Sequence, residues 1–455
     1  MNLWRVVLGV VFCAALAGRV VADPAPPPDP RLGDRMDSRI VRESAASELA
    51  VVPRILVAPL RLAWRGIGFP ARALTNFEGR YHIVHAVIRF VSSLDRMRGL
   101  RPTIRYVSRF DPQLGVTYYD KKLFGPGSSL TVTIGAVLPA LTFAEASMRF
   151  RVPDPYQVTL DAAYLKRVDY LFAGIGLASF GRLRANANPR SRYAQDGITN
   201  EAVTDIRIVP SLHVVLGGGW SYRKYGIGQR DDPGHQKTIL DDYCEGNVNG
   251  CALSRVDPKR VPGYYTGANF FVTDVQFAYD TRAGTRDPLH LWYRFELGAR
   301  YAQSPSREGA RWMHFKTAAN LGFPLGGRTR TLAFRLALEM IQPLGSTPVP
   351  FSELVELGGP DNFRGAPIGR FRDFSSVLAT AEYRWRIWMW MDAVVFTDFG
   401  GTFDKHFGGF RPDRLVPDVG GGVRLHTSSQ FLMRLQLAYG FSQGVQLMFA
   451  TSTPL

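Results

Sequence analysis

The sequence predicts an all-β membrane protein, a 16-stranded antiparallel transmembrane β-barrel that follows a short N-terminal helical segment. Three observations lead to this fold class. The N-terminus resembles an export signal, no later stretch reaches the ~18 apolar residues that mark a transmembrane helix, and apolar and polar side chains alternate through the C-terminal half. Strands are therefore the elements expected to cross the bilayer, closed into a barrel so that no edge meets lipid.

Residues 1–22 read as a signal peptide, in which Arg5 precedes an apolar run and small residues precede Asp23. A first transmembrane helix is the alternative, but the run is shorter than the ~20 residues that span a bilayer. Residues 23–110 are expected to form a Pro-rich linker with short helices at 57–63 and 77–97. These helices either plug the pore or contact lipid, or they pack as a cap before the barrel, and the sequence leaves both readings open.

Alternation is clearest in residues 291–301. Tyr293, Phe295 and Leu297 share one face of an extended chain, whereas Arg294 and Glu296 share the other. The same split recurs at 377–388 and 431–441, over segments long enough for a tilted bilayer crossing. A soluble β-sandwich also alternates, but its strands are usually shorter and its polar face is the outer one. The pattern therefore favours a membrane barrel.

The barrel is expected to occupy residues 111–455. An even number of strands closes an antiparallel sheet without an exposed edge. The expected strands are 115–123, 129–138, 142–151, 156–165, 168–180, 199–210, 212–225, 266–281, 289–301, 312–323, 331–343, 376–388, 389–400, 418–427, 430–441 and 445–451.

Composition and motifs argue against two function classes. The net charge of +16 would suit an anionic partner, but Arg is spread along the chain and no nucleic-acid-binding signature occurs, so we expect no nucleic-acid partner. No catalytic fingerprint sits in a strand–turn–helix context, so we expect no enzyme and no cofactor. An outer-membrane lipase would need a Ser/His/acid set, and His213 and His426 are better explained as wall residues.

Cys244 and Cys251 lie in one polar segment, ILDDYCEGNVNGCALSR. An exported chain meets oxidising conditions, so we expect a local disulfide between them. A zinc site would need four ligands in tetrahedral reach, and the segment offers only these thiols and His235, so no metal site is expected.

The segment LGGPDNFRGAPIGRFRD, residues 357–373, separates the eleventh and twelfth expected strands. It contains Gly358 and Gly359, followed by the tip Phe363-Arg364-Gly365. The thirteenth expected strand carries a second motif, aromatic-x-Asp-x-Gly, at Phe396, Asp398 and Gly400. With these two motifs in this order, the sequence resembles the BamA/TamA-like surface-antigen superfamily of outer-membrane barrels, as a short member without periplasmic polypeptide-transport modules.

The resemblance implies a protein that inserts or translocates proteins, or lipids, at the bacterial outer membrane through a lateral seam between the first and last strands. Its implied partners are outer-membrane lipids and nascent outer-membrane or secreted proteins. A passive pore or a structural barrel without assembly activity is the alternative. In the family, the sixth extracellular loop folds back into the lumen, so residues 357–373 are expected to do so.

The alternation on the thirteenth strand places Asp398 on its polar, lumen-facing side. A guanidinium on an inward loop can pair with such a carboxylate through two hydrogen bonds, and a glycine beside it allows close approach to the wall. We therefore expect Arg364 to meet Asp398. The alternative is that both belong to a generally charged barrel interior and make no specific bond.

Overall fold

The computed structural model describes residues 97–125, 127–137, 141–151, 155–176, 191–228, 237–244, 256–282, 291–306, 308–325, 330–388, 391–426, 431–441 and 443–450. The predicted signal peptide at 1–22 and the predicted helices at 57–63 and 77–97 lie outside these residues, apart from Met97. None of the helices within the described ranges is long and apolar enough to cross a membrane.

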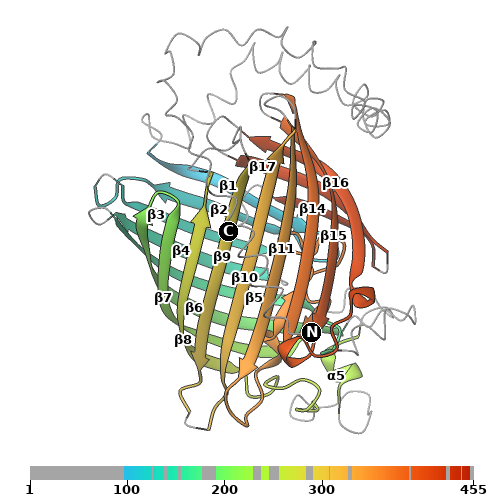
Figure 1. Cartoon of the computed structure of the whole chain (residues 1–455). Coiled ribbons are helices and arrows are strands. Elements are labelled where there is room, and N and C mark those ends of the chain that lie inside the picture. The colour runs from blue at the N-terminus through green and yellow to red at the C-terminus, as the bar shows by residue number, and fades with distance from the viewer. Residues whose placement is uncertain are drawn as a thin grey trace, which may run out of the picture. The chain divides into compact units, whose positions relative to one another are not determined.

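Sixteen of the described strands form one closed antiparallel barrel, which confirms the predicted fold class (Figure 1). Neighbours in the chain pair with each other, and the first strand pairs with the last. The barrel strands are β1 (Arg98–Val107), β2 (Gln113–Asp120), β3 (Ser129–Val137), β4 (Leu141–Arg151), β5 (Tyr156–Phe172), β6 (Ser191–Val209), β7 (Leu212–Ile227), β8 (Ala268–Asp280), β9 (Trp292–Gln303), β10 (Arg311–Pro324), β11 (Arg330–Pro343), β14 (Ser375–Trp388), β15 (Met391–Phe403), β16 (Val416–His426), β17 (Phe431–Gly440) and β18 (Gly444–Ala450).

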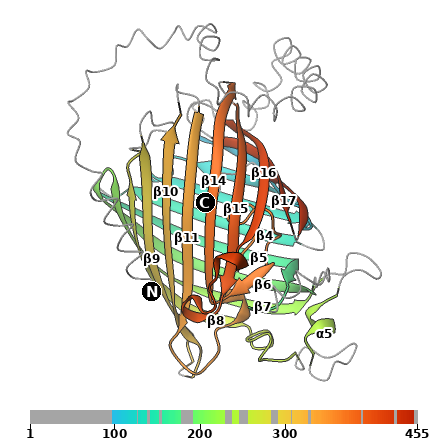
Figure 2. The same cartoon turned by 45° about the vertical axis from the view of Figure 1, so that its right-hand side comes forward.

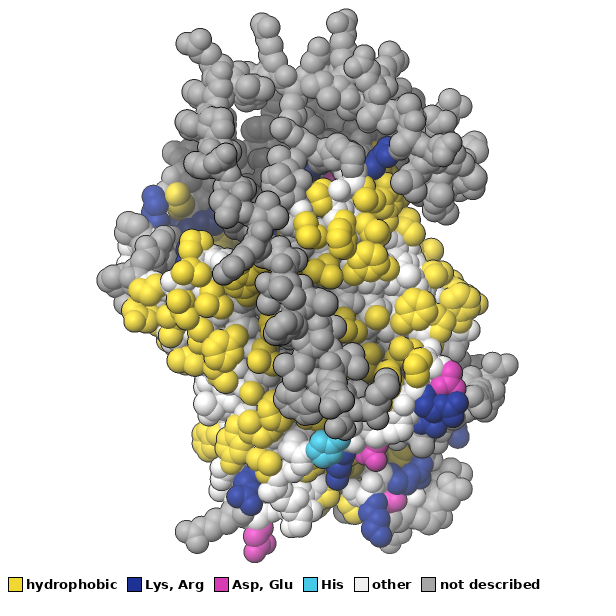
Figure 3. All heavy atoms as spheres, viewed as in Figure 1, with side chains coloured by type: hydrophobic (Ala, Val, Ile, Leu, Met, Phe, Trp, Pro, Cys, Tyr) yellow, Lys and Arg dark blue, Asp and Glu magenta, His cyan; other side chains and the backbone are white. Residues whose placement is uncertain are grey.

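The outer face of the barrel is apolar, as the alternation predicts. On β9, Phe295 and Leu297 are exposed, and on β17 Leu435 and Leu437 are exposed. Hydrophobic side chains dominate the visible outer face (Figure 3). A folded protein exposes such a continuous apolar surface when lipid covers it, because lipid-facing positions alternate with lumen-facing ones along each strand.

The barrel begins earlier than the predicted boundary at residue 111. Its first strand is β1, a segment that the sequence analysis had assigned to the linker, and the strand expected at 115–123 is the second, β2. The alternation in β1 is present but weak, with Leu100 and Ile104 exposed on one face and Arg101 and Arg105 on the other. Pro102 hid the strand, because proline is normally found only at edges of sheets.

A second correction concerns the strands predicted at 156–165 and 168–180. They are one strand, β5, whose pairing with β6 shifts register between Arg167 and Tyr170. A bulge of this kind breaks the two-residue period, so the sequence pattern looked like two strands. The prediction missed β1 and counted β5 as two strands, so the predicted total of sixteen strands still agrees with the structure. In addition, β6 starts at Ser191 and not at residue 199.

The long connections gather at one end of the barrel, which we call the loop end. It carries α5 (Ile239–Asp242), the connection between β15 and β16 with its turns η5 (Lys405–Phe407) and η6 (Pro412–Arg414), and the connection between β11 and β14 (Figure 2). The last of these, residues 344–374, contains η4 (Phe351–Glu353), β12 (Val355–Leu357) and β13 (Phe371–Asp373), and we call it the inward loop.

Aromatic side chains fill the lumen at the loop end. The ring of Phe351, from the inward loop, lies 5.2 Å from those of Phe172 and Tyr193 and 4.8 Å from that of Tyr225, centroid to centroid. These partners stand on β5, β6 and β7, and the cluster continues into the residues around α5. The described part of the barrel therefore has a packed core at this end where a porin would have water.

Candidate functional site

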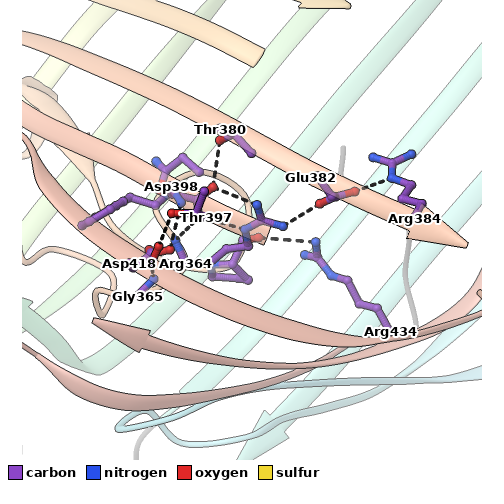
Figure 4. A network of polar contacts seen from close by, with 12 residues as sticks. Arg364, Gly365, Thr380, Glu382, Arg384, Thr397, Asp398, Asp418 and Arg434 are labelled. Carbon is purple, nitrogen blue, oxygen red and sulfur yellow. Dashed lines mark hydrogen bonds and ion pairs between the residues drawn. The ribbon is translucent and has the colours of Figure 1, made fainter. Parts of the chain in front are cut away.

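The inward loop crosses the lumen and reaches the wall formed by β14, β15 and β16, where Arg364 makes its main contacts (Figure 4). Its Nε donates to Asp398 Oδ2 at 2.9 Å and its Nη2 donates to Asp398 Oδ1 at 2.8 Å. Its Nη1 donates to Glu382 Oε2 at 2.7 Å. One guanidinium thus binds two carboxylates on adjacent strands, with the two-pronged geometry that arginine alone provides.

This ion-pair group is removed from solvent. Arg364 is 6% exposed, Glu382 5% and Asp398 0%. Burial by itself lowers the pKa of the Arg364 guanidinium, but the hydrogen bonds and charges of Asp398 and Glu382 outweigh burial and raise that pKa above its usual range. Loss of Arg364 would remove the guanidinium that neutralises the buried Asp398, which is costly in a low-dielectric interior, whereas Glu382 would keep its contacts with Arg384 and Arg424.

Phe396 of the second predicted motif holds the guanidinium from one face. The Arg364 Cζ lies 3.3 Å from the centroid of the Phe396 ring. Phe396 stands on β15, the strand that also carries Asp398. A planar guanidinium can stack on a ring and still direct its N–H groups sideways to carboxylates, whereas a lysine ammonium cannot do both. The aromatic position of the motif therefore has a direct physical role next to the arginine.

Gly365 lets the backbone of the loop touch the wall. Its N–H donates to Asp418 Oδ2, and the other carboxylate oxygen of Asp418 accepts from the Asp398 N–H at 3.2 Å. A Cβ atom at Gly365 would lie 2.3 Å from the Asp418 Cβ, which is closer than atoms can approach. Only glycine fits at this point of contact.

The other predicted glycines shape the loop and its seat. Gly358 and Gly359 have φ angles of +137° and +101°, which side chains disfavour, and they turn the chain so that the Gly359 N–H donates to Ala366 O at 2.8 Å. Gly400, on β15, makes room for the loop, because a Cβ there would lie 2.7 Å from Leu357 and 3.0 Å from the buried ring of Phe363. All eight predicted motif residues thus belong to one contact region.

Glu382 and Asp418 were not among the predicted site residues. Each lies opposite a predicted motif residue, since Asp418 on β16 pairs in register with Asp398 and Glu382 on β14 pairs with Phe396. Thr380 also donates its hydroxyl to Asp398 Oδ1 at 2.8 Å. A lumen-facing acid on each neighbouring strand was the signal in the sequence, and it could be used only once the register was known.

The remaining candidates lie apart from this region. Cys244 is disulfide-bonded, while Cys251 lies outside the described residues, so their pairing stays a prediction. His213 contacts Asp205 at 3.1 Å, and the side chain of His426 is not described. Within the described ranges, no group of three or more His, Cys, Asp or Glu side chains could hold a metal ion.

The sequence matches a known protein family. It matches the Omp85 superfamily domain over residues 107–446, and no curated protein matches the chain significantly. Among solved structures, the chain is similar to BamA from Haemophilus ducreyi lacking POTRA domains 1-3, with a TM-score of 0.52 and 12% sequence identity. That similarity covers 78% of this chain and 69% of the other.

Two further solved structures are CdiB proteins. CdiB from Escherichia coli has a TM-score of 0.49 and 12% identity, over 77% of this chain and 62% of that chain. CdiB from Acinetobacter baumannii has a TM-score of 0.47 and 10% identity, over 77% and 58%. The chain thus spans less than two thirds of either CdiB. The domain match, which extends from the end of β1 into β18, shows that the chain belongs to the Omp85 superfamily, whose outer-membrane barrels insert or translocate proteins.

Proposed function

We propose that this protein inserts or translocates proteins, or lipids, at the outer membrane through the seam between β1 and β18. The observation that carries the proposal is the shortness of this seam. Among the described residues, β1 and β18 pair at three positions, whereas β18 pairs with β17 at seven and β1 with β2 at eight. Fewer backbone pairs make this junction the easiest place to part, and a parted strand edge can accept an incoming strand.

The inward loop and the loop-end core support the same proposal. A passive pore needs a continuous aqueous path, but the ring cluster around Phe351 and the buried contact of Arg364 with Asp398 occupy the lumen. Because the loop is fixed in the lumen, opening must occur in the wall of the barrel, at the seam. The proposed partners are nascent outer-membrane or secreted proteins at the seam and outer-membrane lipids around the apolar outer face.

The test locks the seam. Tyr106 and Phe449 are register partners across it and point to the outer face, so the double variant Tyr106→Cys/Phe449→Cys can be joined by oxidation. The matched control joins Val116→Cys/Ile134→Cys, outward register partners on β2 and β3. Both proteins are placed in lipid vesicles, and folding of an added outer-membrane barrel is followed by its heat-modifiable migration on gels.

We expect the oxidised seam variant to lose most of its activity and to regain it when a reductant is added, while the control keeps its activity in both states. Full activity with the seam locked would refute the proposal. Planar-bilayer recordings address the alternative, because a large, steady conductance of the intact protein would indicate a passive pore.

A further inference from the structure

The tip of the inward loop also contacts the two strands that flank β18. Asp361, three residues before Arg364, accepts a hydrogen bond from Arg105 Nη2 at 2.9 Å through its Oδ2. Through its Oδ1 it accepts from Arg434 Nη2, and Arg434 Nη1 also donates to Pro360 O at 3.4 Å. Arg105 stands on β1 and Arg434 on β17. We call this group the Asp361 bridge.

The bridge spans the seam from inside the lumen. Arg105 is the residue of β1 that pairs with Ala450 of β18, and the same Ala450 pairs with Arg434 of β17 on its other side. The three residues therefore stand at one level of the wall, and their side chains point to the lumen. One carboxylate, with one oxygen for each arginine, thus connects the strand on one side of the seam to a strand on the other.

The bridge differs in strength from the contact that holds the loop. The Arg364 group is almost fully buried, so it keeps the loop attached to β14, β15 and β16. In the bridge, the side chains of Asp361 and Arg105 are 46% and 37% exposed, and only that of Arg434 is buried, at 8%. Half-exposed ion pairs are weak and are screened by salt, so the bridge can break while the loop stays in place.

We propose that the Asp361 bridge holds the seam closed in the resting protein and that a client releases it by displacing the Asp361 side chain, while Arg364 stays bound to the wall. The idea rests on the proposed function of the seam and names a regulator of it. The buried guanidinium of Arg434 favours the closed seam, because in that state the carboxylate of Asp361 neutralises its charge. Among the described residues the seam contributes three residue pairs, so a weak bridge is enough to shift its equilibrium.

The experiment measures the seam in the absence of any client. Spin labels are attached at Tyr118→Cys on β2 and Tyr439→Cys on β17, exposed outer-face positions on opposite sides of the seam. The full chain is placed in lipid vesicles, and the distance between the labels is recorded by pulsed electron resonance. Asp361→Asn removes the charge and keeps the size. The matched control is Asp413→Asn, an exposed carboxylate that pairs with Arg411 in the connection between β15 and β16.

We expect Asp361→Asn to increase the population with the longer label distance at least about threefold, and Asp413→Asn to leave it unchanged. Arg105→Gln should act in the same direction and add little to Asp361→Asn, since both remove the same connection. Equal distance distributions in wild type, Asp361→Asn and Asp413→Asn would overturn the proposal.

A measurement on the wild type covers the case in which Asp361→Asn does not fold, as judged by loss of heat-modifiable migration. Raising the ionic strength from about 0.05 M to about 1 M shortens the Debye length to ~3 Å and should increase the open population of the wild-type seam. Salt-independent distances in the wild type would also overturn the proposal. Because no client is present, failure here leaves the seam-locking test of insertion unaffected, and failure of that test leaves this one unaffected.

Discussion

At the scale of single residues, the contact between Arg364 and the wall combines three kinds of recognition. Asp398 receives two hydrogen bonds from the guanidinium, Glu382 receives a third, and Phe396 stacks on its face. The loop backbone adds the bond from Gly365 to Asp418. A charge buried in this way is stable only with all its partners present, so the energetic consequences of substitution should be large and coupled.

The first prediction concerns this coupling. Arg364→Ala should lower the free energy of unfolding by about 3–5 kcal/mol, because it removes the guanidinium that neutralises the buried carboxylate of Asp398. Asp398→Ala should act similarly, and the double variant should cost at least ~1 kcal/mol less than the sum. Denaturant titration in lipid vesicles measures all three. For the exposed pair, Arg411→Ala and Asp413→Ala should add within about 0.5 kcal/mol. Strict additivity at the buried pair would contradict the assigned contact.

A second prediction concerns Gly365. Gly365→Ala places a methyl group against the Asp418 side chain and should destabilise the protein by about 1–3 kcal/mol. The control is Gly226→Ala on β7, where the nearest atom to the new Cβ is the Ala194 Cβ at 3.7 Å. That change should be neutral or stabilising, because alanine restricts the unfolded chain more than glycine does. Equal effects of the two substitutions in the same unfolding assay would argue against a tight fit at Gly365.

At the scale of elements, the inward loop is a rigid strut and not an open connection. Its two short strands β12 and β13 pair with each other, and Arg372 of β13 donates to Phe351 O at 2.8 Å and contacts Glu356 of β12. Its ends are held in the loop-end core and its tip at the wall and the seam. An element fixed at both places holds Asp361 in position beside the seam, which suits a part that controls the seam.

The loop also carries a carboxyl group with an unfavourable environment. Burial raises the pKa of Asp373 to about 6; the hydrogen bond from the Phe374 N–H opposes this, and the charge of Asp404 adds to it. A folded-state pKa above the unfolded value means that this group contributes stability at low pH and loses it as the pH rises through about 6.

The third prediction follows from this sign. Asp373→Asn should make the protein more stable than wild type at pH ~7, by at most about 3 kcal/mol, and the difference should vanish near pH ~4. Unfolding free energies measured across this range for both proteins check it, and Asp413→Asn serves as an exposed control. A difference that grows toward low pH would show that Asp373 has a charged partner.

The connection between β7 and β8 provides a fourth prediction. Cys244 should be bonded to Cys251, because the two lie in one short segment and Cys244 is disulfide-bonded. Thiol labelling of the mature, unreduced protein should therefore modify neither residue, and mass spectrometry of a protease digest should recover the two peptides linked. If both thiols react without reduction, the assignment fails.

At the scale of the whole molecule, the barrel has an apolar exterior and an interior rich in paired charges. Arg300 of β9, for example, lies 3.2 Å from Asp274 of β8 and, across β7, 3.4 Å from Glu201 of β6 in the lumen. The closed sheet leaves each central strand paired on both sides, so unfolding must break many hydrogen bonds together. Such a barrel should resist detergent strongly.

The fifth prediction uses this resistance. The unheated protein should migrate differently from the boiled protein on gels run in dodecyl sulfate, since the closed barrel binds less detergent than the unfolded chain. Variants of the outer face such as Leu437→Ala should keep this behaviour, whereas Arg364→Ala should lower the temperature at which it is lost. Identical migration with and without heating would argue against a closed barrel.

The sequence by itself determined the fold class, the parity of the strands and the two motifs. Alternation and strand length are properties of adjacent residues, so they can be read without knowing what a strand pairs with. The same local reading failed where the local signal was broken, at Pro102 of β1 and at the bulge after Arg167 of β5. The first failure came from a proline inside a strand, and the second from a bulge that interrupts the two-residue period.

Beyond the expected contact of Arg364 with Asp398, only the tertiary structure decided which side chains meet. Glu382 joins Arg364 from 18 residues away, and Asp361 joins Arg434 from 73 residues away. These contacts depend on the register between strands and on how far the loop reaches across the lumen, and neither quantity is encoded in any short stretch of residues. A carboxylate on a polar face is one of many in such a barrel, and closure of the sheet is what brings a particular one within hydrogen-bonding distance of a guanidinium.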